Sequence, residues 1–127
     1  MQRQNVDFGE GDAVLIRTGW GRLWRVDNAR FMKGEPGIGL AAAEFLARKN
    51  VMMVGSDNWA VEVRPYPDKG LFLPVHGLML TVHGIYLLEN LELEELARDR
   101  AYEFAFIVQP LKLRGGTGSS VAPMAVR

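Results

Sequence analysis

The residues best able to bind a metal ion lie within one stretch of this sequence, residues 75–90. It holds both histidines of the chain, His76 and His83, together with Glu89. The histidines are seven residues apart, about two helical turns, so they need not converge on one ion. A histidine at the start of a helix and a glutamate at the end of a strand, here His76 and Glu89, can share a metal, but their spacing alone is a weak signal. Two ligands fall short of the usual four, and a lone histidine is more often structural.

Polar and aromatic side chains in the irregular segments are further candidates. Asp57 follows an apolar run, at the carboxyl end of an expected strand, where α/β sheets commonly carry function. An aspartate there can equally close a turn by accepting backbone N–H groups. Trp20 and Trp59 lie in expected loops, where large aromatics either cover the core or line a pocket. For these residues the sequence leaves both alternatives open.

Two glycine patterns imitate nucleotide-binding motifs. Residues 37–42, Gly-x-Gly-x-x-Ala, open an expected helix, and Asp57 lies twenty residues after the first glycine. A dinucleotide fingerprint also needs a strand that ends at that glycine, and residues 33–36 are Lys-Gly-Glu-Pro. Residues 115–120 lack the Lys-Ser/Thr ending of a phosphate loop. We therefore interpret the first pattern as a helix entry and the second as a turn, which disfavours a nucleotide-binding domain.

The composition restricts the class of protein. The chain has 127 residues, 48% of them hydrophobic and 24% charged, which fits one globular domain over residues 1–127. A formal net charge of +0 gives no basic field for nucleic acid or an anionic membrane. The absence of cysteine excludes disulfides and cysteine-based zinc sites. The polar N-terminus and the short apolar runs favour a cytoplasmic location and no membrane association.

The hydrophobic pattern indicates an α/β fold, a mixed β-sheet with packed helices. A helix over 40–49 followed closely by an apolar strand over 51–54 is a crossover pattern. We expect a long loop over 18–36 with a helical turn near 26–31. The remaining expected elements are strands over 13–16, 85–88, 102–113 and 121–126, a weak strand over 60–63, and helices over 75–82 and 91–98.

Several strings of residues follow one another along the chain in a familiar order. They are Gly-Asp-Ala-Val-Leu-Ile-Arg-Thr-Gly-Trp (11–20), Pro-Gly-Ile-Gly (36–39), Val-Gly-Ser-Asp-Asn-Trp-Ala (54–60), Val-His (75–76), Gly-Ile-Tyr-Leu-Leu-Glu-Asn-Leu (84–91) and Pro-Leu-Lys-Leu-Arg-Gly-Gly-Thr-Gly-Ser (110–119). In order and spacing they resemble the cyclase family of metal-dependent hydrolases. That family includes bacterial kynurenine formamidases (arylformamidases) and isatin hydrolases.

The resemblance implies a function. It implies the family's β/α sandwich and a divalent metal, zinc or manganese, with His76 and Glu89 among the ligands; His83 aligns with no family ligand. The implied reaction is hydrolysis of an amide or formamide C–N bond, as in tryptophan catabolism, or of a cyclic amide. Trp20 or Trp59 would then flank an aromatic substrate, and the resemblance identifies no catalytic residue beyond the metal pair.

One departure from the family pattern qualifies this expectation. The family's His-x-x-x-His-x-Asp motif is absent, since both histidines are already assigned. The chain therefore resembles the C-terminal half of the family domain only. The alternative function is a non-catalytic fragment or partner subunit without the full metal site. Because a shared sheet would leave strand edges and apolar faces bare, we expect a homo-oligomer or binding to a complementary N-terminal chain.

Overall fold

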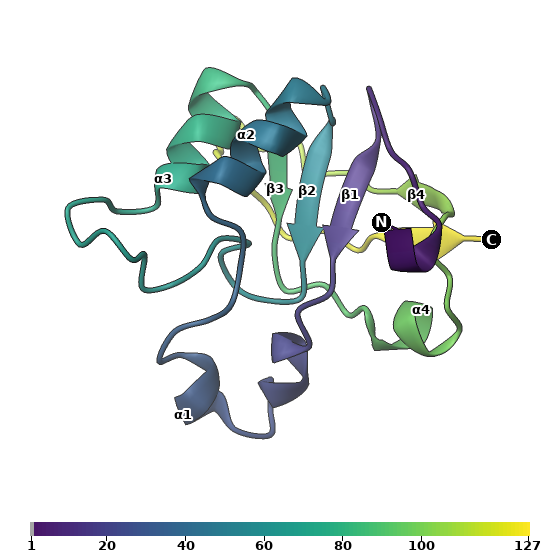
Figure 1. The fold of residues 1–127 in the computed structure, drawn as a ribbon, viewed down its shortest axis with the longest axis horizontal. Helices are drawn as coiled ribbons and strands as arrows, with labels where there is room; N and C mark the ends of the chain where they lie inside the picture. The colour runs from purple at the N-terminus through teal and green to yellow at the C-terminus, as the bar shows by residue number, and fades with distance from the viewer. Residues whose placement is uncertain (1) are drawn as a thin grey trace.

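A short parallel sheet lies at the centre of the protein (Figure 1). The computed structural model describes residues 2–127. Its sheet contains β1 (Ala13–Ile16), β2 (Met53–Ser56) and β3 (Tyr86–Leu88), in the order β1-β2-β3. Both pairings are parallel, and all four residues of β2 are buried. Because β2 is central, the residues that follow it emerge between the carboxyl ends of its two neighbours.

Helices cover one face of this sheet. They are α2 (Leu40–Arg48) and α3 (Pro74–His76), which continues as the π-helical segment η3 (Gly77–Val82) (Figure 1). The core lies between these helices and the sheet. It contains Ala43, Leu46, Ala47, Val51, Val54, Val61, Val75, Met79 and Ile85. The apolar positions of α2 recur every three or four residues, which directs one stripe of the helix onto the strands.

A small lobe follows β1 at the carboxyl end of the sheet (Figure 1). It holds the 3₁₀ turn η2 (Trp20–Leu23) and α1 (Asn28–Phe31). Asp27 begins α1 by accepting the Arg30 N–H at 3.0 Å, an ordinary N-cap contact. Phe31 anchors the lobe because its side chain is buried.

The C-terminal region forms a separate two-stranded layer. After α4 (Glu94–Arg98), β4 (Ala105–Ile107) pairs antiparallel with β5 (Met124–Val126). An ion pair between Arg127 and Asp99, 2.8 Å long, connects the chain end to the residue that follows α4. A cavity of about 420 Å³ separates this layer from the open face of the sheet. The chain also contains a 3₁₀ turn, η1 (Gln2–Gln4).

The structure confirms the α/β fold class and corrects the extent of several elements. The expected strand over 102–113 is wrong outside Ala105–Ile107, because only the three residues of β5 pair with it. The expected strand over 60–63 is reduced to one isolated bridge, at Glu62, and a second bridge lies just beyond it at Arg64. The strand expected over 51–54 lies at Met53–Ser56, two residues later. Within residues 2–127, no helix is both long and apolar enough to cross a membrane.

Candidate functional site

His76 is fixed by a buried glutamate. It ends α3, and its Nδ1 lies 2.6 Å from Oε1 of Glu62, whose side chain is 1% exposed. The same carboxylate accepts the backbone N–H groups of Val75, at 3.2 Å, and His76, at 3.0 Å. A carboxylate only accepts hydrogen bonds, so the ring donates from Nδ1. This contact fixes the orientation of the imidazole and directs Nε2 away from Glu62.

Glu89 stands on the other side of the imidazole. It directly follows β3, and its Oε1 lies 3.3 Å from Nε2 of His76. Glu89 and then Glu62 raise the pKa of His76 against the opposing effect of burial, so without a metal the ring is stabilised as an imidazolium. The structure thus brings the two selected residues, His76 and Glu89, within direct contact.

The position of Glu62 depends on a close approach between two backbone segments. A Cβ on Gly37 would collide with the backbone of Glu62, and Ile38 exchanges two hydrogen bonds of 3.1 Å with Val61 and Val63. The glycine pattern at 37–42 therefore serves chain packing. The sequence analysis missed Glu62 as a site residue. Its signal was a carboxylate inside the apolar run Ala60-Val61-Glu62-Val63.

A second buried acid, Glu35, was also missed. Its side chain is 4% exposed; Oε2 accepts the Trp59 N–H at 2.9 Å, and Oε1 is buried without a hydrogen-bond partner within residues 2–127. Burial raises the pKa of Glu35 to about 7, and the negative charge of Glu89 adds to the shift. Glu35 thus belongs to the same electrostatic neighbourhood as the His76 pair.

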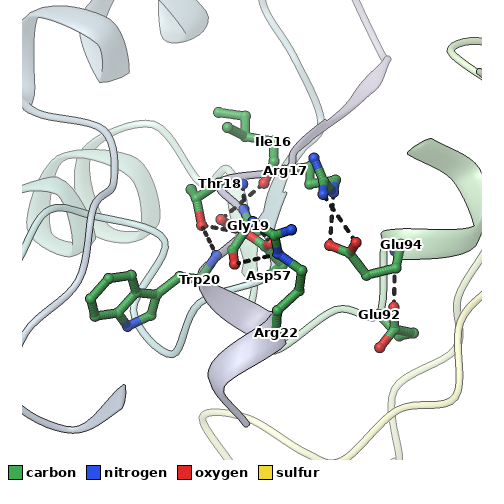
Figure 2. Close-up of polar contacts among 10 residues, drawn as sticks. Ile16, Arg17, Thr18, Gly19, Trp20, Arg22, Asp57, Glu92 and Glu94 are labelled. Carbon is green, nitrogen blue, oxygen red and sulfur yellow. Dashed lines mark hydrogen bonds and ion pairs between the residues drawn. The ribbon is translucent and has the colours of Figure 1, made fainter. Parts of the chain in front are cut away.

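Asp57 supports a turn. Its carboxylate accepts the Thr18 N–H at 2.7 Å, the Thr18 hydroxyl at 2.6 Å and the Gly19 N–H at 2.7 Å (Figure 2). Asp57 is 3% exposed, so its own chain occupies the carboxylate. The alternative left open by the sequence is resolved in favour of a structural role, at the junction between β1 and the lobe. Beside it, Arg17 forms a two-point ion pair with Glu94 at 2.8 and 3.0 Å (Figure 2).

The tryptophans occupy different places relative to the His76 pair. Trp20 donates its indole N–H to the Phe31 carbonyl at 3.3 Å, inside the lobe. Trp59 lies on the segment between β2 and Glu62, half-buried, with its backbone bound to Glu35. Within residues 2–127, neither indole forms a hydrogen bond with His76 or Glu89. His83 is exposed at the end of η3 and does not join His76.

The His76 pair suits part of a metal centre. Metal-binding histidines commonly donate their second ring nitrogen to a carboxylate, as His76 does to Glu62. Two ligands of a tetrahedral ion with bonds of ~2.0–2.1 Å lie roughly 3.3 Å apart, which equals the Nε2–Oε1 separation. Residues 2–127 bring together no group of three or more candidate ligands. The chain therefore offers two ligands and one supporting carboxylate.

Comparisons with known proteins place this geometry in a family. The model of the family named Cyclase matches residues 1–63. A solved structure described as a novel cyclase superposes with a TM-score of 0.85 at 32% identity over 99% of this chain. The chain therefore resembles the cyclase family. An isatin hydrolase bound to the product analogue thioisatinate also matches the chain, with a TM-score of 0.81 at 27% identity over 98% of it.

The chain is shorter than these relatives. It covers 43% of the novel cyclase and 48% of the isatin hydrolase. No curated protein sequence matches it.

Proposed function

We propose that this chain contributes a metal site to the hydrolysis of an amide C–N bond. One observation carries the proposal: His76 is held between the buried carboxylate of Glu62 and the accessible carboxylate of Glu89. A structural histidine needs one partner, whereas His76 has its second nitrogen directed at a carboxylate that is 39% exposed. His76 and Glu89 are therefore positioned to bind one cation together, with Glu62 fixing the orientation of His76.

Each residue has a distinct task in the proposed site. Glu62 accepts the Nδ1 proton, which leaves the Nε2 lone pair free to bind a divalent ion. Glu89 supplies an oxygen ligand and part of the balancing negative charge. Zinc or manganese bound there would lower the pKa of a bound water, which would provide a hydroxide able to attack a carbonyl near neutral pH. The unusually basic Glu35 is suited to hold a proton close to the site.

The substrate we propose is an aromatic amide or formamide, as for an arylformamidase, or a cyclic amide. The isatin hydrolase among the structural neighbours favours amide chemistry on a small aromatic molecule. Trp59, between Asp57 and Glu62 in sequence, is the better placed of the two tryptophans to contact it, because Trp20 is bound within the lobe. Assignment to tryptophan catabolism rests on the family resemblance alone, and assignment to the cytoplasm rests on the cysteine-free composition.

The test compares two histidine variants. Natively purified protein should contain zinc or manganese by mass spectrometry and should hydrolyse formanilide or isatin. His76→Ala should no longer bind the metal, and its turnover should fall at least about 100-fold, because only one of the two ligands, Glu89, remains. His83→Ala is the matched control and should behave like the original protein, since His83 is exposed and away from His76. Unchanged turnover in His76→Ala would overturn the proposal.

A second candidate function is a non-catalytic partner subunit. It is favoured by the small ligand set, because two candidate ligands meet within residues 2–127 and no group of three does. On this alternative the purified chain carries no metal and hydrolyses neither substrate, with or without added Zn²⁺ or Mn²⁺. Stoichiometric metal and turnover in the chain alone would exclude it.

A further inference from the structure

A cavity of about 420 Å³ lies between the open face of the central sheet and the C-terminal layer. Apolar side chains from both layers line it, among them Leu15, Leu88, Leu91, Leu93, Leu96 and Phe106. Protein interiors are closely packed, and few internal spaces in them are larger than one water molecule. A space of this size between two layers of one chain is therefore suited to side chains from another segment.

The same cavity carries an excess of negative charge. The carboxylates that line it are Glu89, Glu92, Glu95 and Asp99. The one guanidinium among the lining residues, that of Arg127, is already paired with Asp99 at 2.8 Å. Leu93 is 6% exposed, whereas Glu92 and Glu95 are exposed, so the apolar part lies deep and these two carboxylates lie at the opening. The cavity therefore favours an occupant that combines apolar and positively charged side chains.

Residues 111–114, Leu-Lys-Leu-Arg, have the complementary chemistry. Leu111 and Leu113 are 61% and 55% exposed. Neither Lys112 nor Arg114 forms an ion pair within residues 2–127. In an extended segment of this sequence the two leucines project to one side and the two cations to the other. Long basic side chains cover apolar surface with their stems and keep their charges at its edge, so the leucines suit the apolar part of the cavity and the cations suit its carboxylates.

No residue of this segment lines the cavity of its own chain. The segment follows β4, and the chain turns back at Gly115, where φ is 72°, before it continues to β5 (Figure 1). The Leu111 N–H donates to the Ser119 hydroxyl at 3.1 Å, and the Gly116 N–H donates to the Leu113 carbonyl at 3.1 Å. These local contacts close the turn and leave both leucines on the surface, where a second chain can cover them.

Charge distinguishes two ways in which copies of the chain could use this segment. If two such segments paired with each other, Lys112 and Arg114 would face like charges, which is unfavourable across a strand pair. If the segment enters the cavity of a second copy, the same cations meet Glu92 and Glu95. The second arrangement is therefore the favourable one.

We propose that residues 111–114 of each copy dock into this cavity of a second copy, so that the chain forms a two-fold dimer. Each copy then contributes one segment and one cavity, as a two-fold interface requires. The exposed surface of 8877 Å² exceeds the about 6,800 Å² of a compact monomer of 14.2 kDa by more than the ~800 Å² that each partner buries in a standard interface. The inference does not rest on the proposed function, because Glu92 and Glu95 lie outside the His76 pair.

The experiment exchanges the charges of the segment and the cavity in the full chain. One variant carries Lys112→Glu with Arg114→Glu, and the other carries Glu92→Lys with Glu95→Lys. Each variant alone sets like charges against each other in both contacts, so its dimer dissociation constant should rise at least about 10-fold above that of the original protein. In an equimolar mixture, each segment meets a cavity of opposite charge, and dimers of one copy of each variant should form again. Sedimentation velocity measures all of these dissociation constants.

Lys49→Glu with Lys69→Glu is the matched control for the segment variant. It changes the net charge equally, at two exposed residues outside the segment and the cavity, and should keep the original dissociation constant. Recovery of dimers in the mixture separates a lost contact from a folding defect, because a misfolded variant would not pair. A monomeric original protein, unaltered dimers in both charge-reversed variants, or a mixture that stays monomeric would each overturn the inference.

Discussion

Glu35 is the residue whose chemistry departs furthest from its ordinary behaviour. Its pKa is raised from 4.5 to about 7 by burial, so the folded protein holds this proton more tightly than the unfolded chain does. Stability is therefore lost as the pH rises from about 4.5 to about 7. Glu35→Gln removes that loss because the amide does not ionise. The melting temperature of the variant should exceed that of the original by on the order of 5 °C at pH 8 and match it near pH 4.5.

The pH dependence of stability due to His76 can be separated from that due to Glu35. The pKa of His76 is also raised, so its contribution is complete below about 6.5 and is lost as the pH rises through the raised value. That part of the pH dependence should persist in Glu35→Gln. Melting curves at half-unit pH steps measure both parts. A pH profile identical to that of the original protein would show that the pKa of Glu35 is the same in the folded and the unfolded chain.

At the scale of single residues, the sequence located part of the candidate site. The family resemblance is the main indication for His76 and Glu89, since their places at a helix and a strand end are a weak signal, and the structure sets their side chains 3.3 Å apart. Glu62 and Glu35 were missed because each lies in an irregular segment that forms isolated β-bridges and shows no hydrophobic periodicity. Their burial depends on contacts between residues 35–38 and 59–64, which no local pattern encodes. Asp57 illustrates the converse, since its position suited function but its carboxylate closes a turn.

The elements around the site depend on one glycine contact. The segment before α2 touches the segment that carries Glu62, and Gly37 leaves no room there for a Cβ. Gly37→Ala should therefore displace Glu62 from His76 and destabilise the fold by about 2–3 kcal/mol. Gly39→Ala is the control two residues later, where the new Cβ would meet only the Tyr66 hydroxyl at 3.9 Å. Urea unfolding measures both, and equal midpoints for the two variants would refute the packing argument.

The contrast between α2 and β4 shows which elements a sequence can predict. The helix over 40–49 was expected from a repeating apolar stripe and lies at Leu40–Arg48. The apolar run over 102–113 carries an equally strong signal, yet only Ala105–Ile107 is strand. A helix satisfies its own backbone, whereas a strand needs a partner of matching length. Here β5 supplies three paired residues, and Ile107 and Leu111 remain exposed.

The surface of the whole molecule is larger than a chain of this size should expose. Its accessible surface is 8877 Å², against about 6,800 Å² expected for a compact monomer of 14.2 kDa. The difference of roughly 2,000 Å² exceeds the ~800 Å² that each partner buries in a standard protein–protein interface. Both β1 and β3 are edge strands, and exposed apolar residues continue along the C-terminal layer, among them Tyr102, Leu113 and Val126. These features favour association with a second chain.

We predict that the chain self-associates, because the bare strand edges and apolar surface are present in every copy. Sedimentation velocity at 1–100 µM should show a species heavier than 14.2 kDa whose share grows with concentration. Val126→Lys should shift the distribution toward the monomer, since a charge on the exposed side of β5 opposes pairing between copies. Val26→Lys is the matched control, because Val26 is 81% exposed in the lobe, away from β5. A single monomeric species at every concentration would contradict the prediction and leave a complementary chain as the partner to seek.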